Sequence, residues 1–296
     1  MIYRDWMKYI KDETPLTSLI IPSAHNAGTY GMAKIACCQD HDVYTQFCYG
    51  IRHFCVRLDT KKNEIVLCHG PFTGDTFIHA LEGFKKIIDE TETEFIIIDL
   101  KEYYPQKLGP FTFRYKADPK EVSRLVKEYL HPEKYAFCEF DDIRKVTMGD
   151  VRRSGKKFLL VNWDKEYDYS ADCPTALPWD KKIFGMKAAD FAEHCLKFMD
   201  AETDGFLWFQ TQQTPNFGTD EGMRYPRTMD TELRGCFERI IQGIAENERY
   251  LEKANIISGD FMTEDYMKSR SILALNILKN NVIPELEGEY ARGLWR

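Results

Sequence analysis

The sequence predicts an α/β fold, an irregular (β/α)8 TIM-like barrel formed by a single domain over residues 1–296. Short apolar runs alternate along the chain with longer stretches in which apolar residues recur at helical spacing. Strands that are apolar at nearly every position are typical of parallel sheets that are covered on both faces. A length of 296 residues also suits one barrel of this kind.

Eight apolar runs are the predicted strands. In chain order they are residues 19–22, 53–58, 64–68, 94–100, 157–162, 182–186, 205–209 and 255–260. Helical spacing of apolar residues, and in one case a helix start at Asp118-Pro119, predicts helices between them. These helices are expected over residues 76–91, 118–129, 188–200, 230–251 and 265–280.

The balance of charged residues excludes some classes of binding partner. Lys and Arg total 40 against 47 Asp and Glu, so the formal net charge is −7. This balance argues against a nucleic-acid partner and against strong electrostatic binding to anionic membranes. No apolar run approaches the roughly 20 residues of a membrane span, and the first residues lack the apolar centre of a signal peptide. We therefore expect a monomer that contacts membranes only transiently.

Nine cysteines are scattered along the chain without a CxxC pair, which argues against a zinc site. Cys55 and Cys68 lie inside strand-like runs, where a thiol behaves as a small apolar group. This usage favours a reducing, cytoplasmic compartment with peripheral membrane contact. A secreted form stays open, as does any disulfide pairing.

Ionisable side chains follow or end five of the predicted strands: His25, Arg57, His69, Lys101 and Asp260. In a barrel the carboxyl ends of the strands meet at one mouth, where active sites lie. Closure of the last strand onto the first would bring Asp260 beside His25. Two imidazoles beside a guanidinium are the groups needed to cleave a phosphodiester by acid–base chemistry.

Five segments together resemble the catalytic X domain of phosphatidylinositol-specific phospholipase C. They are residues 23–29 (Ser-Ala-His-Asn-Ala-Gly-Thr), 50–57, 66–70, 94–102 and 255–261. The wording around His25 is most similar to the small eukaryotic X-domain-only proteins and to the protozoan phospholipases that cleave glycosylphosphatidylinositol (GPI). The resemblance spans about residues 5–280, and it rests on the set of segments rather than on any one of them.

The resemblance implies a phosphorus–oxygen lyase that cleaves the inositol phosphodiester and releases diacylglycerol and inositol 1,2-cyclic phosphate. His25 is then the general base, oriented by Asp260, and His69 is the general acid. Arg57 neutralises the phosphoryl oxygens, and Lys101 is a candidate contact to the inositol hydroxyls. Since the unperturbed pKa of histidine is about 6.5, the two imidazoles are expected to start in opposite protonation states near neutrality.

No metal or cofactor is expected. The calcium-dependent members of the family place acidic ligands where this chain has Cys55 and Arg57, and a thiol and a guanidinium cannot replace hard oxygen ligands. Two departures concern the substrate: Asn26 stands where bacterial members have Asp, and Asn162 stands where they have an inositol-binding arginine. Asn26, Asn162 and Trp163 join Lys101 as expected substrate-binding residues.

Several alternatives remain at the level of sequence. Asp260 also fits a strand-end cap, and Lys101 fits a solvated lysine after a strand. A metal-dependent glycerophosphodiester phosphodiesterase uses a similar barrel, and a catalytically silent module could keep the pocket for inositol lipids. The preference between phosphatidylinositol and GPI, and the lipid tails, are not determined by the sequence.

Overall fold

The computed structural model describes residues 2–101, 106–108, 111–113, 117–161, 168–183, 186–214, 224–264 and 267–291. Parallel strands run side by side in the order β8, β5, β2, β1, β11, β10 and β9. Their bounds are β1 (Ile21–Ala24), β2 (His53–Lys61), β5 (Ile96–Lys101), β8 (Phe158–Val161), β9 (Thr175–Ala176), β10 (Phe206–Gln210) and β11 (Ile256–Gly259). A parallel bridge from Val161 to Ala171 links the segment before β9 back to β8. The expected α/β fold with an irregular TIM-like barrel is confirmed.

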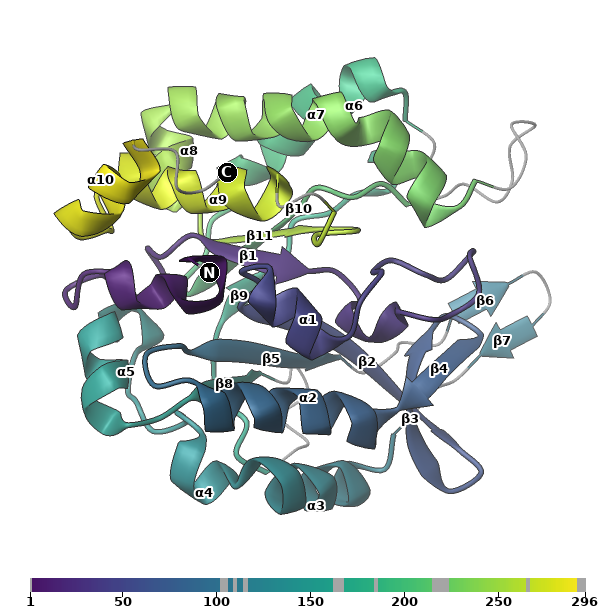
Figure 1. The fold of residues 1–296 in the computed structure, drawn as a ribbon. Coiled ribbons are helices and arrows are strands. Elements are labelled where there is room, and N and C mark those ends of the chain that lie inside the picture. The colour runs from purple at the N-terminus through teal and green to yellow at the C-terminus, as the bar shows by residue number, and fades with distance from the viewer. Residues whose placement is uncertain are drawn as a thin grey trace.

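Helices cover the outside of the sheet (Figure 1). Below the strands in that view lie α2 (Phe77–Glu90), α3 (Pro119–Leu130), α4 (Pro132–Tyr135) and α5 (Met148–Ser154). Above them lie α6 (Ala188–Leu196), α7 (Pro226–Glu246), α8 (Glu248–Lys253), α9 (Met267–Leu278) and α10 (Pro284–Ala291). Side chains of Thr76 and Asp118 cap the first turns of α2 and α3, at the starts that the sequence predicts.

The remaining elements are short. The 3-10 helices are η1 (Ile2–Tyr9), η2 (Ala27–Thr29), η3 (Ile143–Lys145), η4 (Lys181–Ile183) and η5 (Lys197–Asp200), and one further α-helix is α1 (Val43–Cys48). Strands β6 (Gln106–Leu108) and β7 (Phe111–Phe113) form a separate antiparallel pair. Among the described residues, no helix combines the length and the apolar character that crossing a membrane requires.

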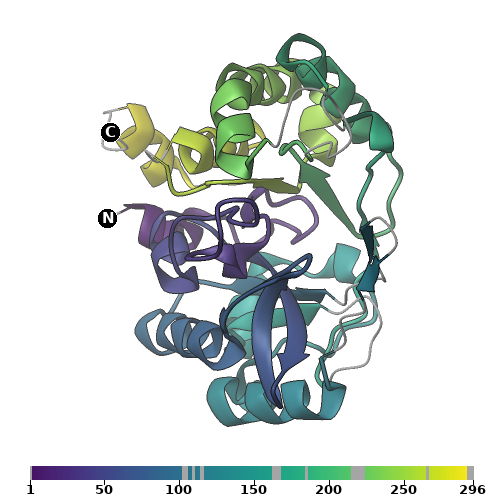
Figure 2. The same ribbon diagram turned by 90° about the vertical axis from the view of Figure 1, so that its right-hand side faces the viewer.

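Two of the predicted strands are wrong in place or kind. Residues 64–68 belong to β3 (Glu64–His69), which is antiparallel to β2 rather than a parallel barrel strand, and β3 continues into β4 (Phe72–Thr76). Lys62 and Asn63, with φ of 51° and 66°, make the two-residue turn between β2 and β3. This hairpin projects from the sheet toward the viewer in Figure 2.

The strand predicted over residues 182–186 does not form, because Lys181–Ile183 is a 3-10 helix whose Lys182 amide donates to the Asp180 carboxylate at 2.7 Å. In its place, β9 pairs with β10, and the isolated bridge from Val161 to Ala171 is the link between this segment and β8, so over the described residues the sheet is not closed by a continuous ladder. Residues 162, 184 and 185 of the predicted strands lie outside the described residues.

Alternate residues of the parallel strands enter two separate apolar clusters. Phe54 and Val56 of β2 pack in the larger cluster, between the sheet and the outer helices. Cys55 belongs to the second cluster, which fills the barrel interior and its base. Strand β5 divides in the same way, with Ile97 inside. Because successive strand side chains point to opposite faces, this pattern fixes which residues face the barrel interior.

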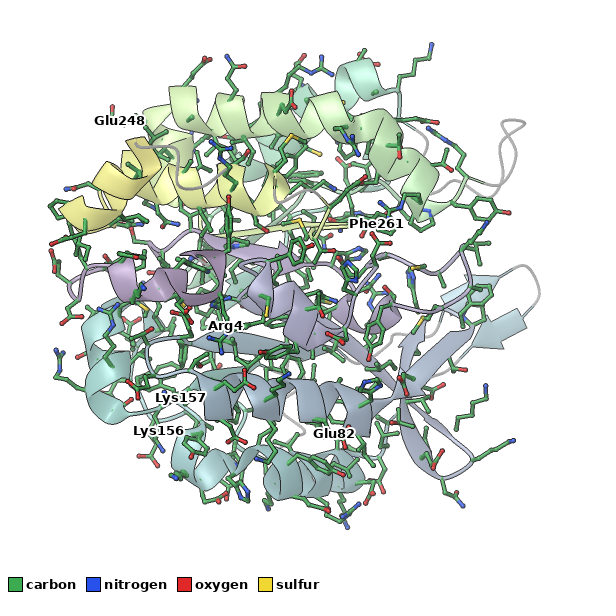
Figure 3. All side chains as sticks on the ribbon, viewed as in Figure 1. Arg4, Glu82, Lys156, Lys157, Glu248 and Phe261 are labelled. Atoms are coloured by element: carbon green, nitrogen blue, oxygen red, sulfur yellow. The ribbon has the colours of Figure 1, made fainter. Side chains whose placement is uncertain are left out.

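The two ends of the barrel have different contents. The amino-terminal helix η1 closes the base, where Trp6 is 1% exposed and its indole donates to the Gly50 carbonyl at 3.0 Å. Figure 3 labels Lys157, just before β8, toward this end and Phe261, just after β11, toward the opposite side with β3 and β4. The carboxyl ends of the parallel strands therefore form the other end, the mouth.

Candidate active site

Register and alternation gather four predicted site residues at the mouth. Ala24 is the partner of Gly259, so His25 and Asp260 leave their strands side by side. Arg57 is the partner of Lys101 across β2 and β5. Arg57 lies two residues beyond the inward-facing Cys55, and Lys101 lies four beyond Ile97, so both share the inward face.

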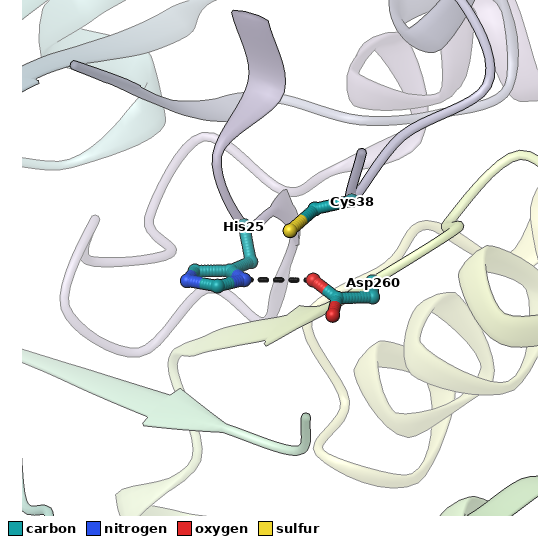
Figure 4. A group of neighbouring side chains, drawn as sticks. All are labelled: His25, Cys38 and Asp260. Carbon is teal, nitrogen blue, oxygen red and sulfur yellow. Dashed lines mark hydrogen bonds and ion pairs between the residues drawn. The ribbon is translucent and has the colours of Figure 1, made fainter. Parts of the chain in front are cut away.

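His25 and Asp260 form a hydrogen-bonded pair. His25 Nδ1 lies 2.7 Å from Asp260 Oδ1, and the two side chains are 13% and 5% exposed (Figure 4). Burial, followed by the charges of Arg57 and Lys101, lowers the pKa of His25 well below its usual value. A neutral His25 that donates its Nδ1 proton to the carboxylate keeps Nε2 as a proton acceptor.

Asp260 is itself held in a mixed electrostatic environment. Burial raises its pKa to about 7, while the nearby Lys268, His69 and Arg57 act in the opposite direction. Lys268, which is 6% exposed, donates to the Asp260 backbone carbonyl at 2.5 Å and also pairs with Asp230. Helices α7 and α9 thus fix the backbone that presents Asp260.

His69 is delivered by the hairpin strand β3 rather than by the barrel. Its Nδ1 lies 2.7 Å from the Ala36 carbonyl, so Nδ1 is assigned the proton and Nε2 is left for other partners. The His69 and His25 ring centroids are 6.4 Å apart with the planes at 83°. That separation allows two imidazoles to act on opposite sides of one phosphorus centre.

Burial, then the charge of Arg57, lowers the pKa of His69 to about 4. Burial and the guanidinium thus favour the neutral form of both rings in the substrate-free protein. That the two histidines start in opposite protonation states when substrate is bound stays a prediction. A proton donor at His69 requires an anion that offsets Arg57.

Lys101 is not a solvated lysine. Its Nζ lies 3.6 Å from the centroid of the Trp208 ring, and burial lowers its pKa. Trp208, on β10, is fully buried. The ammonium is therefore held across the barrel interior, at the same level as Arg57.

The other expected substrate-binding residues are Asn26, Asn162 and Trp163. Asn26 is 1% exposed with φ of 48°, and its amide Nδ2 lies 3.6 Å from Cys38 Sγ. Asn26 is therefore buried against the Cys38 thiol, and its contact with substrate stays a prediction. Asn162 and Trp163 lie outside the described residues.

Sequence analysis missed the loop of residues 36–39, which supports the site from above. Gln39, fully buried, donates from Nε2 to the carbonyls of His25 at 2.8 Å and Gly259 at 3.1 Å. Ala36 orients His69, and Cys38 lies next to the His25–Asp260 pair. The loop has no periodic pattern, and its only sequence signal is a polar Gln between strands.

A third histidine lies deeper in the barrel. His53 Nδ1 is 2.7 Å from Ser23 Oγ, and burial lowers the pKa of His53 to about 3. It packs against Trp208 with ring centroids 4.8 Å apart. These contacts form a polar layer in the barrel interior.

Comparisons with known proteins agree with this geometry. The chain is 28% identical over 166 residues to 1-phosphatidylinositol phosphodiesterase of Listeria monocytogenes, which covers 53% of the chain and 48% of the relative. The chain thus aligns with about half the length of this curated relative. No family model matches the chain.

Solved structures share the whole fold. The phosphatidylinositol-specific phospholipase C from Listeria monocytogenes superposes with a TM-score of 0.67 at 19% identity, covering 93% of this chain and 98% of that one. A double mutant of the Staphylococcus aureus enzyme gives 0.66 at 14% identity, covering 95% and 98%. The chain therefore has the irregular barrel of the bacterial phosphatidylinositol-specific phospholipases C, and it shares sequence with one of them.

Proposed function

We propose that the protein is a metal-independent phospholipase C that cleaves the phosphodiester of phosphatidylinositol or of GPI anchors. The observation that carries the proposal is the grouping of His25 with Asp260 at 2.7 Å and with the His69 ring at 6.4 Å, both imidazoles lying within reach of the Arg57 charge. The Listeria relative is named for the same phosphodiester, which supports the assignment.

The reaction is an attack within the substrate. His25 Nε2 removes the proton of the inositol 2-hydroxyl, and Asp260 stabilises the imidazolium that forms. The 2-oxygen bonds to phosphorus as the bond from phosphorus to the glycerol oxygen breaks. Since nucleophile and electrophile belong to one molecule, the step gains a large proximity advantage. The products are diacylglycerol and inositol 1,2-cyclic phosphate.

His69 supplies the proton that the glycerol oxygen needs on leaving. Its lowered pKa in the substrate-free protein follows from burial and from Arg57. The phosphodiester anion bound at Arg57 offsets that positive charge, which raises the pKa of His69 when the substrate is in place. Substrate binding thereby charges the acid that the reaction uses.

Arg57 takes the place of a metal ion. A guanidinium can meet two phosphoryl oxygens with parallel hydrogen bonds and stabilise the charge that develops on them. Lys101, its neighbour in the register, is proposed to contact the inositol hydroxyls, and its place at the mouth beside Arg57 supports that role. The motif around His25 supports a relationship to the small eukaryotic X-domain-only proteins and to the protozoan GPI-specific enzymes.

Membrane contact is proposed to be transient and through the mouth. Trp179, which follows β9, is 40% exposed, and Tyr225, which precedes α7, is 38% exposed. Amphipathic aromatic side chains suit the membrane interface. We propose a cytoplasmic, monomeric protein that docks on an inositol lipid surface during turnover.

The test is phosphorus NMR of phosphatidylinositol vesicles incubated with the protein in the presence of EDTA. We expect a cyclic phosphate signal to appear and His25→Ala to abolish it. Loss of turnover in EDTA with recovery in added divalent cation would instead indicate a metal-dependent phosphodiesterase. Vesicle binding without any product would indicate a silent lipid-binding module.

A further inference from the structure

Three side chains of different chemistry meet beside the catalytic pair. His25, Cys38 and Asp260 each present one donor atom, a ring nitrogen, a sulfur and a carboxylate oxygen, all within 4.8 Å of one another. Figure 4 shows the sulfur of Cys38 next to the line that joins the ring and the carboxylate. The three donors come from the end of β1, the loop of residues 36–39 and the end of β11.

Backbone hydrogen bonds to η2 and to the segment after β11 hold Cys38 in place. The Cys38 amide donates to Thr29 Oγ1 at 2.9 Å, and the Cys38 carbonyl accepts from the Phe261 amide at 2.8 Å. The next residue, Gln39, bonds the carbonyls of His25 and Gly259. The backbone therefore holds the thiol against the pair, and the three donors are already grouped.

We propose that His25, Cys38 and Asp260 form a binding site for a borderline-soft divalent cation such as Zn²⁺, and that its occupation inhibits the enzyme. An imidazole nitrogen, a thiolate sulfur and a carboxylate oxygen are the three ligand types that Zn²⁺ takes in proteins, at about 2.0–2.3 Å. A fourth position of the tetrahedron is left for water. Ca²⁺ and Mg²⁺ are not expected to bind, because they require oxygen ligands.

Inhibition follows from the proton and bond balance. The cation takes the place of one proton, that of the Cys38 thiol, which is released to solvent. The proton on Nδ1 of His25 moves to Nε2, because a neutral imidazole binds a metal through a ring lone pair, and Nδ1 then binds the metal in place of its hydrogen bond to Asp260. Asp260 can no longer stabilise an imidazolium, and His25 loses its capacity as a base. The inhibition rests on the proposed function, whereas the binding does not.

Cobalt absorption tests the binding on the full chain. Co²⁺ in a site with a thiolate ligand gives a sulfur-to-metal charge-transfer band, and a tetrahedral site gives strong visible bands. We expect one Co²⁺ per chain with both features, displaced by Zn²⁺. Cys38→Ser should lose the charge-transfer band, and His25→Ala should weaken binding at least tenfold.

Cys37 provides the matched control. It is the neighbouring cysteine, but its sulfur faces the Gln39 carbonyl at 3.2 Å and is not part of the cluster. Cys37→Ser should keep the band and the affinity. A band that persists in Cys38→Ser, when thermal unfolding shows that the variant is folded, or that disappears in Cys37→Ser alone, would overturn the proposed site.

The ratio of the rates with and without Zn²⁺ on phosphatidylinositol vesicles tests the inhibition. We expect EDTA to restore the parent and the Zn²⁺ concentration for half-inhibition to rise at least tenfold in Cys38→Ser and to stay unchanged in Cys37→Ser. Equal sensitivity of both variants would contradict the inhibitory role. If the protein showed no lipase activity at all, the proposed function would fail, while the cobalt spectra would still decide the site.

Discussion

Arg52, just before β2, and Arg57, within β2, have opposite environments. Arg52, at the base of the barrel just before β2, is fully buried and donates from Nε to Glu94 at 2.8 Å. It also donates to the carbonyls of Phe47 at 3.0 Å and Ile51 at 2.9 Å, and to that of Arg4 in η1. The Arg52 charge is thus neutralised by Glu94 inside the protein. The same side chain links α1 and η1 at the base of the barrel.

Arg57 lies in β2, near the mouth of the barrel. Its positive charge lowers the pKa of His25 and of His69, so it acts on groups that take up and release protons. In barrels the base serves stability and the mouth serves chemistry. The comparison teaches that an arginine is structural at the base of the barrel and functional at its mouth.

The largest effect is expected for the two mouth histidines. His25→Ala and His69→Ala should each lower kcat/KM on phosphatidylinositol vesicles by at least about 10³-fold, because each removes a proton-transfer step. Both variants should remain folded in thermal unfolding, since neither ring belongs to the apolar core clusters. Near-normal turnover of either variant would remove that histidine from the mechanism.

At the base, the expected loss is in stability instead. Arg52→Met or Glu94→Gln leaves one buried partner uncompensated, which should cost about 3–5 kcal/mol in urea unfolding. The double variant Arg52→Met/Glu94→Met should be more stable than the sum of the single losses implies. If the single variants unfolded like the parent but lost turnover, the division between base and mouth would be wrong.

Arg57→Lys tests whether the guanidinium does more than carry charge. A lysine keeps the charge but not the paired donors, so kcat should fall by roughly 10²-fold or more. Arg52→Lys is the matched change at the other end and should lower stability while leaving kcat/KM of the folded protein within about threefold. Activity of Arg57→Lys within a few-fold of the parent would contradict the metal-replacing role.

The smallest expected effect is a separation of two pH profiles. The profile of kcat/KM reports the free protein, where His69 has a pKa of about 4, so its alkaline limb lies at low pH. The profile of kcat reports the complex, where the bound phosphodiester raises the pKa of His69. Its alkaline limb should therefore lie at higher pH, by about one unit or more. Coincident alkaline limbs would show that substrate does not charge His69.

Much of the mouth could be predicted because it depends on strand ends. His25, Arg57, Lys101 and Asp260 follow or end apolar runs, and parallel strands bring such positions together whatever the loops do. His69 was placed at the mouth for the wrong reason, since its strand is half of a hairpin. Two left-handed residues, Lys62 and Asn63, make that turn, and neither is a glycine that would have signalled it.

What the sequence could not predict depends on long-range contacts. The segment from Ala171 to Ala176 contributes only an isolated bridge to β8 and the two residues of β9, which is too short for any periodic pattern. The strand predicted over residues 182–186 depended on apolar residues such as Ile183, which packs in the core from a 3-10 helix instead. The support of His25 by Gln39 comes from a loop, where no period relates residue to role.

The most direct measurement uses an inositol phospholipid that lacks the 2-hydroxyl. The central claim is that His25 activates this hydroxyl for attack on the adjacent phosphorus, with Arg57 in place of a metal ion. With EDTA present, the account predicts that the 2-deoxy lipid inhibits competitively and releases no diacylglycerol. Release of diacylglycerol from that lipid at a rate near that of phosphatidylinositol would contradict the claim.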